Sequence, residues 1–116
     1  MLKQILNKFL VLNGVQAAMV VEENGEIIES IKSGIVIDKK NLDAIISTIM
    51  LDSKATAWRF GNAPLSMVFL EFSDNFIILG PIAEEFYLVI IAKNTANIGQ
   101  ITYEMKKNQG DIVSEL

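Results

Sequence analysis

The stretch that most constrains the fold is residues 39–60, which carries apolar residues at helical spacing and leads into a second apolar stretch, residues 65–72. At about 100° per residue, Leu51, Ala55 and Trp58 cluster on one side of the expected helix. A helix that is apolar on two sides needs two partners, so we expect one side to pack on a β-sheet and the other to meet a second partner. The sheet-facing stripe comprises Leu42, Ile45, Ile46, Ile49, Ser53, Thr56, Ala57 and Phe60.

The length and composition favour one small domain with an interface. A chain of 116 residues fits one domain, which we expect to span residues 1–116. Hydrophobic residues make up 51% and charged residues 21% of the sequence. That is apolar for a small domain, which has much surface to cover, so part of the apolar content is expected at an interface.

The charge and the absence of cysteine exclude several classes of function. The net charge is −4 and the longest basic runs are pairs of lysines, so binding to nucleic acid is not expected. The chain has no cysteine, which excludes disulfides and indicates a cytoplasmic protein. The N-terminal stretch lacks the apolar core of a signal peptide, and no apolar run approaches the roughly 18 residues of a membrane helix. We expect no membrane insertion.

The first third of the chain reads as a helix followed by a hairpin. Residues 2–12 form an amphipathic pattern, and residues 15–23 and 26–31 are extended and rich in β-branched residues. Between the two strands, Asn24 and Gly25 predict a two-residue turn in which both residues have positive φ.

A connection over residues 32–37 then leads to Asp38, which is placed to cap the long helix. Turn-forming residues 61–64 end that helix. A final helix is expected to begin near Asn94 and Thr95, with an apolar stripe of Ile98, Ile101, Met105, Ile112 and Leu116. Three more strands are expected before it, at residues 65–72, 76–80 and 85–92.

The element order is helix, two strands, helix, three strands, helix, which predicts an α+β layer structure. The last three strands are apolar on both alternating sides, so helices should cover both faces of the sheet. If the first hairpin joins the last strand through its own first strand, residues 65–72 lie at an edge. That edge is apolar and contains neither proline nor lysine, so it invites pairing, most simply with its own copy about a twofold axis.

Three stretches resemble the Roadblock family of small dynein-light-chain-like domains. Residues 15–28 are similar to the first hairpin of the family, and residues 41–50 lie where its long helix begins. The sequence LVIIA at residues 88–92, followed by TANIGQI at residues 95–101, is similar to the last strand and the opening of the final helix. Their order and spacing carry the resemblance over nearly the whole chain.

The resemblance implies a profilin-like fold. It predicts a five-stranded antiparallel sheet in the order 2-1-5-4-3, with the long helix on one face and the two terminal helices on the other. Family members pair through the third strand and the long helix, which gives a continuous ten-stranded sheet. They regulate or scaffold Ras-like GTPases, and any stimulation of GTP hydrolysis would work by repositioning GTPase residues without donating a catalytic residue. No motif in this sequence carries that stimulation.

The side chains offer little chemistry of their own. The chain has no histidine and no cysteine, so most general-base, triad and metal schemes cannot be assembled, and we expect no catalytic residue, no metal and no cofactor. Arg59 is the only arginine and could act as a finger on a GTPase. The favoured interpretation is that it complements the dipole at the carboxyl end of the helix.

The candidate site is therefore a pair of surfaces. Trp58 could fold back over the core, but Leu51 and Ala55 share its side, which favours an interface. The pattern does not apportion these three residues between a twin helix and a GTPase. The expected dimer interface comprises Leu65, Met67, Phe69, Glu71, Leu51 and Ala55. The expected partner-binding residues are Asp43, Ser47, Leu51, Lys54 and Trp58.

Two functions of different classes follow. The first is a homodimeric, non-enzymatic regulator or adaptor that binds a Ras-like small GTPase. The alternative is a scaffold subunit of a larger assembly, which would bind without regard to nucleotide. A small-ligand sensor is weaker, because both faces of the sheet look filled.

Overall fold

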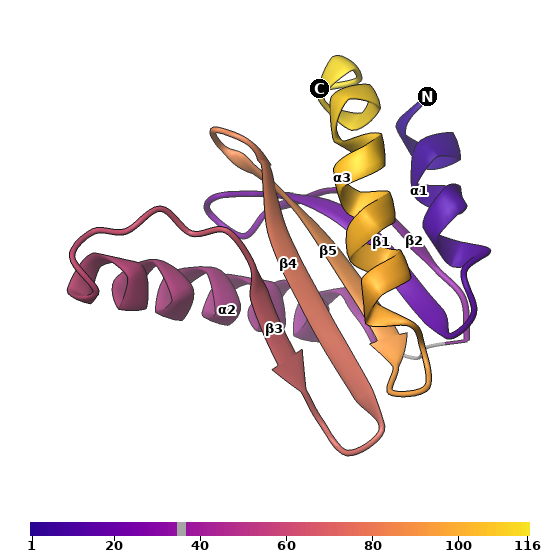
Figure 1. Cartoon of the computed structure of the whole chain (residues 1–116), viewed down its shortest axis with the longest axis horizontal. Helices are drawn as coiled ribbons and strands as arrows, with labels where there is room; N and C mark the ends of the chain where they lie inside the picture. Colours follow the sequence, from indigo (N-terminus) through magenta and orange to yellow (C-terminus); the bar gives the residue numbers. More distant parts are fainter. Residues whose placement is uncertain (35–36) are drawn as a thin grey trace.

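The computed structural model describes residues 1–34 and 37–116, in which three helices and a five-stranded antiparallel sheet are arranged in the order β2-β1-β5-β4-β3 (Figure 1). This confirms the predicted α+β fold class, element order and strand order. The connection expected over residues 32–37 includes residues 35 and 36, which lie outside the described residues. The elements are α1 (Leu2–Leu10), β1 (Val15–Glu22), β2 (Ile27–Lys32), α2 (Lys39–Arg59), β3 (Val68–Glu71), β4 (Asn75–Ala83), β5 (Phe86–Lys93) and α3 (Ile98–Ser114).

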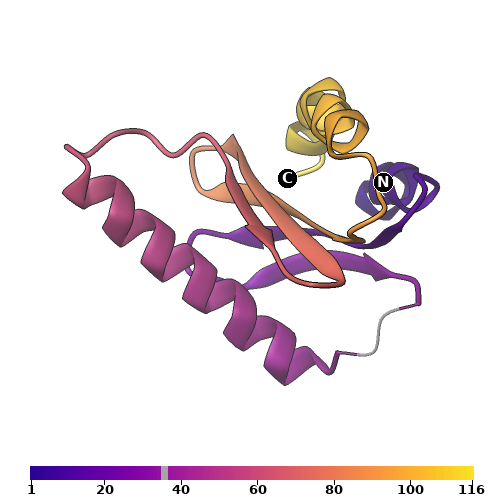
Figure 2. The same ribbon diagram turned by 60° about the horizontal axis from the view of Figure 1, so that its bottom comes forward.

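Helices cover both faces of the sheet, as the two apolar sides of the strands predict. Figure 2 shows α2 on one face and α1 with α3 on the other. Alternate residues of the central strands point to opposite faces, so the strands supply two separate cores. The core under α1 and α3 includes Leu6, Phe9, Val20, Phe76, Ile78, Leu88, Ile90 and Ile101. The core under α2 includes Met19, Val21, Leu42, Ile46, Met50, Leu79, Val89 and Ile91.

Local signals fix both ends of α2. The carboxylate of Asp38 accepts a hydrogen bond from the backbone N–H of Asn41 at 2.8 Å, which confirms the predicted cap. At the other end, Gly61 and Asn62 have φ of 81° and 56°, in the left-handed region. The backbone N–H of Asn62 donates to the carbonyl of Trp58 at 3.0 Å. These two residues end the helix and turn the chain back toward the sheet.

The final helix begins later than its sequence predicts. The cap is Asn97, whose side-chain oxygen accepts from the backbone N–H of Gln100 at 3.0 Å. The expected start at Asn94 and Thr95 is therefore wrong. The Asn94 amide donates instead to the carbonyl of Ser73 at 2.7 Å, so it ties the end of β5 to the turn between β3 and β4.

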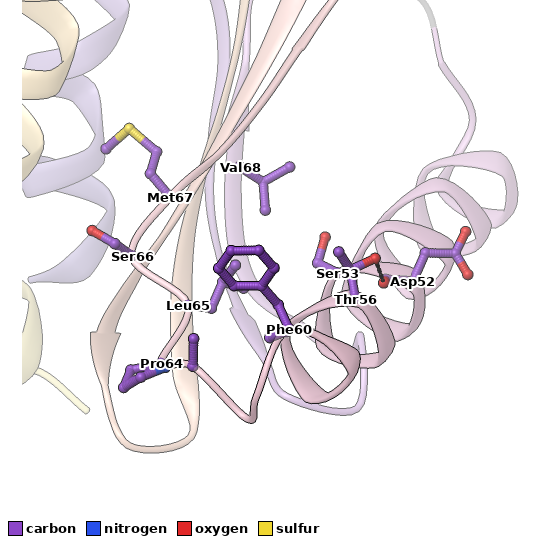
Figure 3. A pocket seen from close by; sticks show the side chains of 11 residues that line it. Asp52, Ser53, Thr56, Phe60, Pro64, Leu65, Ser66, Met67 and Val68 are labelled. Atoms are coloured by element: carbon purple, nitrogen blue, oxygen red, sulfur yellow. Dashed lines mark hydrogen bonds between the residues drawn. The ribbon is translucent and has the colours of Figure 1, made fainter.

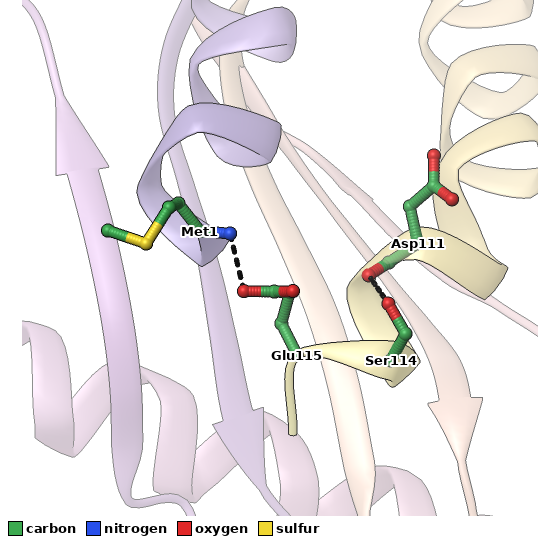
Figure 4. Close-up of polar contacts among 4 residues, drawn as sticks. All are labelled: Met1, Asp111, Ser114 and Glu115. Atoms are coloured by element: carbon green, nitrogen blue, oxygen red, sulfur yellow. Dashed lines mark hydrogen bonds and ion pairs between the residues drawn. The ribbon is translucent and has the colours of Figure 1, made fainter.

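The stripe of α3 is also only partly buried. Ile101, Met105 and Ile112 lie in the core, whereas Ile98 and Leu116 at the two ends are 40% and 42% exposed. The exposed ends of α1 and α3 also meet, through the Met1 ammonium and a Glu115 carboxylate oxygen at 2.5 Å (Figure 4). That ion pair is exposed to water and contributes little to stability.

The β1–β2 turn differs from the expected two-residue type. The backbone N–H of Glu22 donates to the carbonyl of Glu26 at 2.8 Å, so the pair closes a three-residue loop. Only Gly25 in that loop has positive φ, at 92°, whereas Asn24 does not. A side chain on Gly25 would also collide with Ser47 of α2, so the glycine lets the turn lie against the helix.

The edge strand is half as long as predicted. β3 covers Val68–Glu71 and pairs with β4 alone, whereas the expected strand began at Leu65. In the register of this pairing Ser66 would lie opposite Pro81, and proline has no amide hydrogen to donate to the ladder. The regular pairing therefore stops before it reaches Leu65, although the predicted position at the edge of the sheet is confirmed.

Candidate functional site

The carboxyl-terminal half of α2 extends beyond the sheet. All buried residues of this 21-residue helix lie between Leu42 and Met50, and none of the residues from Leu51 to Arg59 is buried. Figure 1 shows this half projecting past the β3 edge of the sheet. The expectation that the whole stripe from Leu42 to Phe60 packs on the sheet is wrong in its second half, because no strand lies beneath it. Phe60 is 82% exposed.

A groove separates the projecting half of α2 from the segment that leads into β3. Its volume is about 550 Å³, and we call it the overhang groove (Figure 3). On the helix side it is lined by the second half of the stripe, including Ser53, Thr56 and Phe60. Leu65 and Val68 line the opposite wall. The Thr56 hydroxyl donates to the carbonyl of Asp52 at 2.8 Å, so the helix satisfies this polar group itself and the groove stays largely apolar.

β3 borders the overhang groove and has one unpaired edge. Val68 packs against the core under α2, whereas the ring of Phe69 lies on the other face, 5.4 Å from the ring of Phe76. Phe69, Leu70 and Phe72 are 41%, 37% and 55% exposed. Apolar side chains thus extend from both faces of an edge strand that lacks a second neighbour among the described strands.

The other apolar side of α2 faces away from this edge. Leu51, Ala55 and Trp58 are all exposed, Leu51 by 71% and Trp58 by 69%, and we call these three residues the outer face of α2. Leu51 and Ala55 line a shallow pocket together with Glu23 and Asn24 of the β1–β2 turn. The overhang groove is lined by a different set of α2 residues, so the two apolar surfaces lie on different sides of the helix.

The polar residues expected near the outer face lie along one side of α2. Ser47 lines the same shallow pocket as Leu51, and Lys54 forms an ion pair with Glu23 of the turn. Asp43 lies one turn of helix before Ser47 and is half-buried. Both side chains of the Lys54–Glu23 pair are partly exposed, so the pair contributes little to stability.

The structure thus brings most of the expected partner-binding residues together and divides the expected dimer residues. Leu65, Met67, Phe69 and Glu71 lie on or just before β3. Leu51 and Ala55 were grouped with them in the sequence but lie beside the β1–β2 turn instead. Sequence reasoning missed that Ser53, Thr56 and Phe60 line the overhang groove. The apolar stripe of α2 is continuous in the sequence, and only the extent of the sheet determines at which residue the stripe leaves the core. The small polar side chains of Ser53 and Thr56, in place of the earlier isoleucines of the stripe, were the available signal.

Few groups at these surfaces could carry chemistry. Arg59 is exposed in the last turn of α2, where a cation complements the helix dipole. In the part of the chain that the structure describes, no group of three or more His, Cys, Asp or Glu side chains is placed to hold a metal ion. None of the described helices is long and apolar enough to cross a membrane.

The chain matches a known family in sequence and known structures in fold. The family model of the Roadblock/LC7 domain matches residues 1–92. The structure is similar to MglB of Myxococcus xanthus, with a TM-score of 0.85 and 17% identity over 97% of this chain and 85% of that chain. It is similar to a Roadblock/LC7 domain from Streptomyces avermitilis, with a TM-score of 0.81 and 13% identity over 97% and 94% of the two chains. It is also similar to a structure of MglB with a tetrameric arrangement, with a TM-score of 0.80 and 16% identity over 96% of this chain and 84% of that chain. No curated protein matches the sequence.

Proposed function

The chain belongs to the Roadblock/LC7 domain family, and from this premise we propose that it is a homodimeric, non-enzymatic regulator or adaptor of a Ras-like small GTPase. The observation that carries the proposal is the long helix α2, which exposes one apolar side toward the β3 edge and another away from it. Two separate surfaces allow the protein to bind its own copy and a different protein at the same time.

Self-association is supported by the β3 edge and the overhang groove together. Antiparallel pairing of β3 with its copy would satisfy the unpaired backbone and cover Phe69 and Leu70. The projecting half of α2 would then reach the partner, and Ser53, Thr56 and Phe60 would face an apolar surface instead of water. Because each copy offers the same edge and the same helix, a twofold axis closes the assembly. The tetrameric arrangement described for MglB is consistent with association between copies of such a chain.

The outer face of α2 stays free in that dimer and is proposed as the GTPase-binding surface. It lies on a different side of α2 from the overhang groove, so Leu51 and Ala55 are assigned to the partner and not to the twin helix. Trp58 extends this surface toward the end of the helix, and Asp43, Ser47 and Lys54 lie along its polar margin. Exposed aromatic and aliphatic side chains of this kind frequently anchor protein interfaces.

Any stimulation of GTP hydrolysis is proposed to act by positioning residues of the GTPase. The outer face itself offers no arginine, since Arg59 lies at the end of the helix and outside the set Leu51, Ala55 and Trp58. We also propose that residues 1–116 form one domain, and that the protein acts in the cytoplasm. A nucleotide-independent scaffold is the alternative function, supported by the two exposed apolar sides of α2, which could bind other proteins through apolar contact alone.

The test uses a purified Ras-like GTPase encoded in the same genome, loaded either with GDP or with a non-hydrolysable GTP analogue. Size-exclusion chromatography with light scattering is expected to give twice the chain mass of 12.9 kDa alone, and a larger complex with the analogue-loaded GTPase. Leu51→Asp should abolish the complex and preserve the dimer. Val113→Asp, which places the same charge on an exposed apolar position of α3, should change neither. Equal binding to both nucleotide states would favour the scaffold, and a monomeric mass at micromolar concentration would refute the homodimer.

A further inference from the structure

The acidic charge of the protein is concentrated at one end of the sheet. We call this region the acidic end. It consists of Glu22 at the end of β1, Glu23 and Glu26 in the β1–β2 turn, and Glu84 and Glu85 in the β4–β5 turn. The two turns lie side by side, because the backbone N–H of Glu23 donates to the carbonyl of Glu85 at 2.8 Å. Glu22, Glu23 and Glu85 also line one shallow pocket.

This region accounts for the net charge of the chain. It holds five of the 14 acidic residues, and one of the 10 basic residues, Lys54, reaches it. The nine acidic residues elsewhere are matched by nine basic residues, so the net charge of −4 is carried at the acidic end. A charge imbalance confined to one region produces a local field, which selects partners of the opposite sign and speeds their encounter.

The acidic end adjoins the outer face of α2. Glu23 and Asn24 line the pocket that also contains Leu51 and Ala55, and Glu23 is the partner of Lys54 on the same helix. Gly25 makes this approach possible, because any side chain there would collide with Ser47. The result is a continuous surface, apolar along α2 and negative along the adjoining turns.

We propose that this combined surface docks a partner whose contact region joins apolar side chains to lysine or arginine. The apolar part would cover Leu51, Ala55 and Trp58, and the basic part would lie over the acidic end. The inference rests on the proposed function in one respect: it describes the contact region of the partner that is proposed to bind the outer face of α2. Lys54 lies within the acidic region and already neutralises Glu23, so it opposes the docking of a basic partner.

The first test measures charge preference with defined probes. One helical peptide of leucine and lysine and one of leucine and glutamate, matched in length and leucine positions, are titrated into the full-length protein. Trp58 is the only tryptophan of the chain and lies in the proposed surface, so its emission reports binding directly. The lysine peptide is expected to bind at least tenfold more tightly at low ionic strength, and raising the salt to about 0.5 M should remove most of that difference.

The second test uses charge variants with opposite expected effects. Glu22→Gln together with Glu85→Gln should weaken binding of the lysine peptide about two- to threefold for each charge removed. Lys54→Gln should strengthen it about two- to threefold, because Glu23 is left without its partner. Asp111→Asn and Lys107→Gln, two exposed positions on α3, are control variants that remove one charge of each sign away from this surface, and neither should have an effect.

The outcomes separate this inference from the proposed function. Equal affinity for both peptides, or charge variants that leave lysine-peptide binding unchanged, would overturn it even if a GTPase binds. The expected peptide results without any GTPase complex would support it and count against the proposed function. If Leu51→Asp instead converts the dimer to a monomer, the outer face binds a second copy of the chain and the inference fails.

Discussion

The neighbouring residues Met50 and Leu51 give a sharp test of which side of α2 is core. The side chain of Met50 is 2% exposed and packs in the core beneath α2, whereas that of Leu51 is 71% exposed on the outer face. Both are unbranched at Cβ and sit in the same turn, so replacing either by alanine changes helix propensity little. The two variants therefore differ mainly in the environment of the side chain that is removed.

The magnitudes follow from that burial. Met50→Ala should lower the free energy of unfolding by about 2–5 kcal/mol, the range for deleting a buried side chain and leaving a cavity. Full burial of a leucine side chain stabilises a protein by about 2 kcal/mol. Because Leu51 is 71% exposed, only about 29% of that stabilisation applies, and Leu51→Ala should lower the free energy of unfolding by roughly 0.6 kcal/mol. The exposed 71% of the Leu51 side chain is available to a partner. Removing this side chain should therefore weaken partner binding about tenfold, equivalent to roughly 1.4 kcal/mol.

The assay is urea unfolding of both variants at one protein concentration, repeated at a second concentration, together with titration of the purified GTPase. A concentration-dependent stability loss in Leu51→Ala would show that the side chain is covered by a second copy. A loss of more than about 2 kcal/mol at both concentrations would show that Leu51 belongs to the core of the single chain and would refute the division of α2 into two sides.

Three further predictions test the edge and the local geometry. Leu70→Lys, which places a charge on the exposed edge strand, should reduce the mass measured by light scattering to that of a single chain and leave the circular dichroism spectrum unchanged. Gly25→Ala should lower the free energy of unfolding, measured by thermal unfolding, by about 1–3 kcal/mol, because φ at this residue is 92° and the new side chain would collide with Ser47. Gly61→Ala is the control, because Gly61 also has positive φ but a side chain there would meet no neighbour, so this variant reports the backbone strain alone. Asp38→Ala should cost about 1 kcal/mol through loss of the cap on Asn41, whereas Asp38→Ser should retain most of it in urea unfolding.

The layers of the fold were predictable because they depend on patterns within single elements. Strands such as β5 are apolar on both sides, which requires helices on both faces, and the cap at Asp38 and the turn at Gly61 fixed the limits of α2. Features that depend on two distant segments were not predictable in this way. The length of β3 is set by Pro81, a residue of the neighbouring strand that is read only once the register is known.

The candidate site shows the same division. Periodicity identified Leu51, Ala55 and Trp58 as a second apolar side of the helix, and the structure finds all three exposed. Periodicity could not tell which side faces β3, because that depends on how the helix lies across the sheet. It also could not reveal that Phe60 leaves the core, because the stripe is continuous and the width of the sheet is not encoded in the helix.

The short edge strand has a consequence for the kind of assembly that this protein can form. Four residues supply few backbone pairs, so a foreign strand that met β3 alone would gain little. A stable contact therefore requires the projecting half of α2 to contact the second copy at the same time as β3. Because the angle between α2 and β3 is fixed, only one relative orientation of the two copies allows both contacts. Requiring both elements at once favours a closed pair over an open-ended fibre, which an exposed apolar strand would otherwise invite.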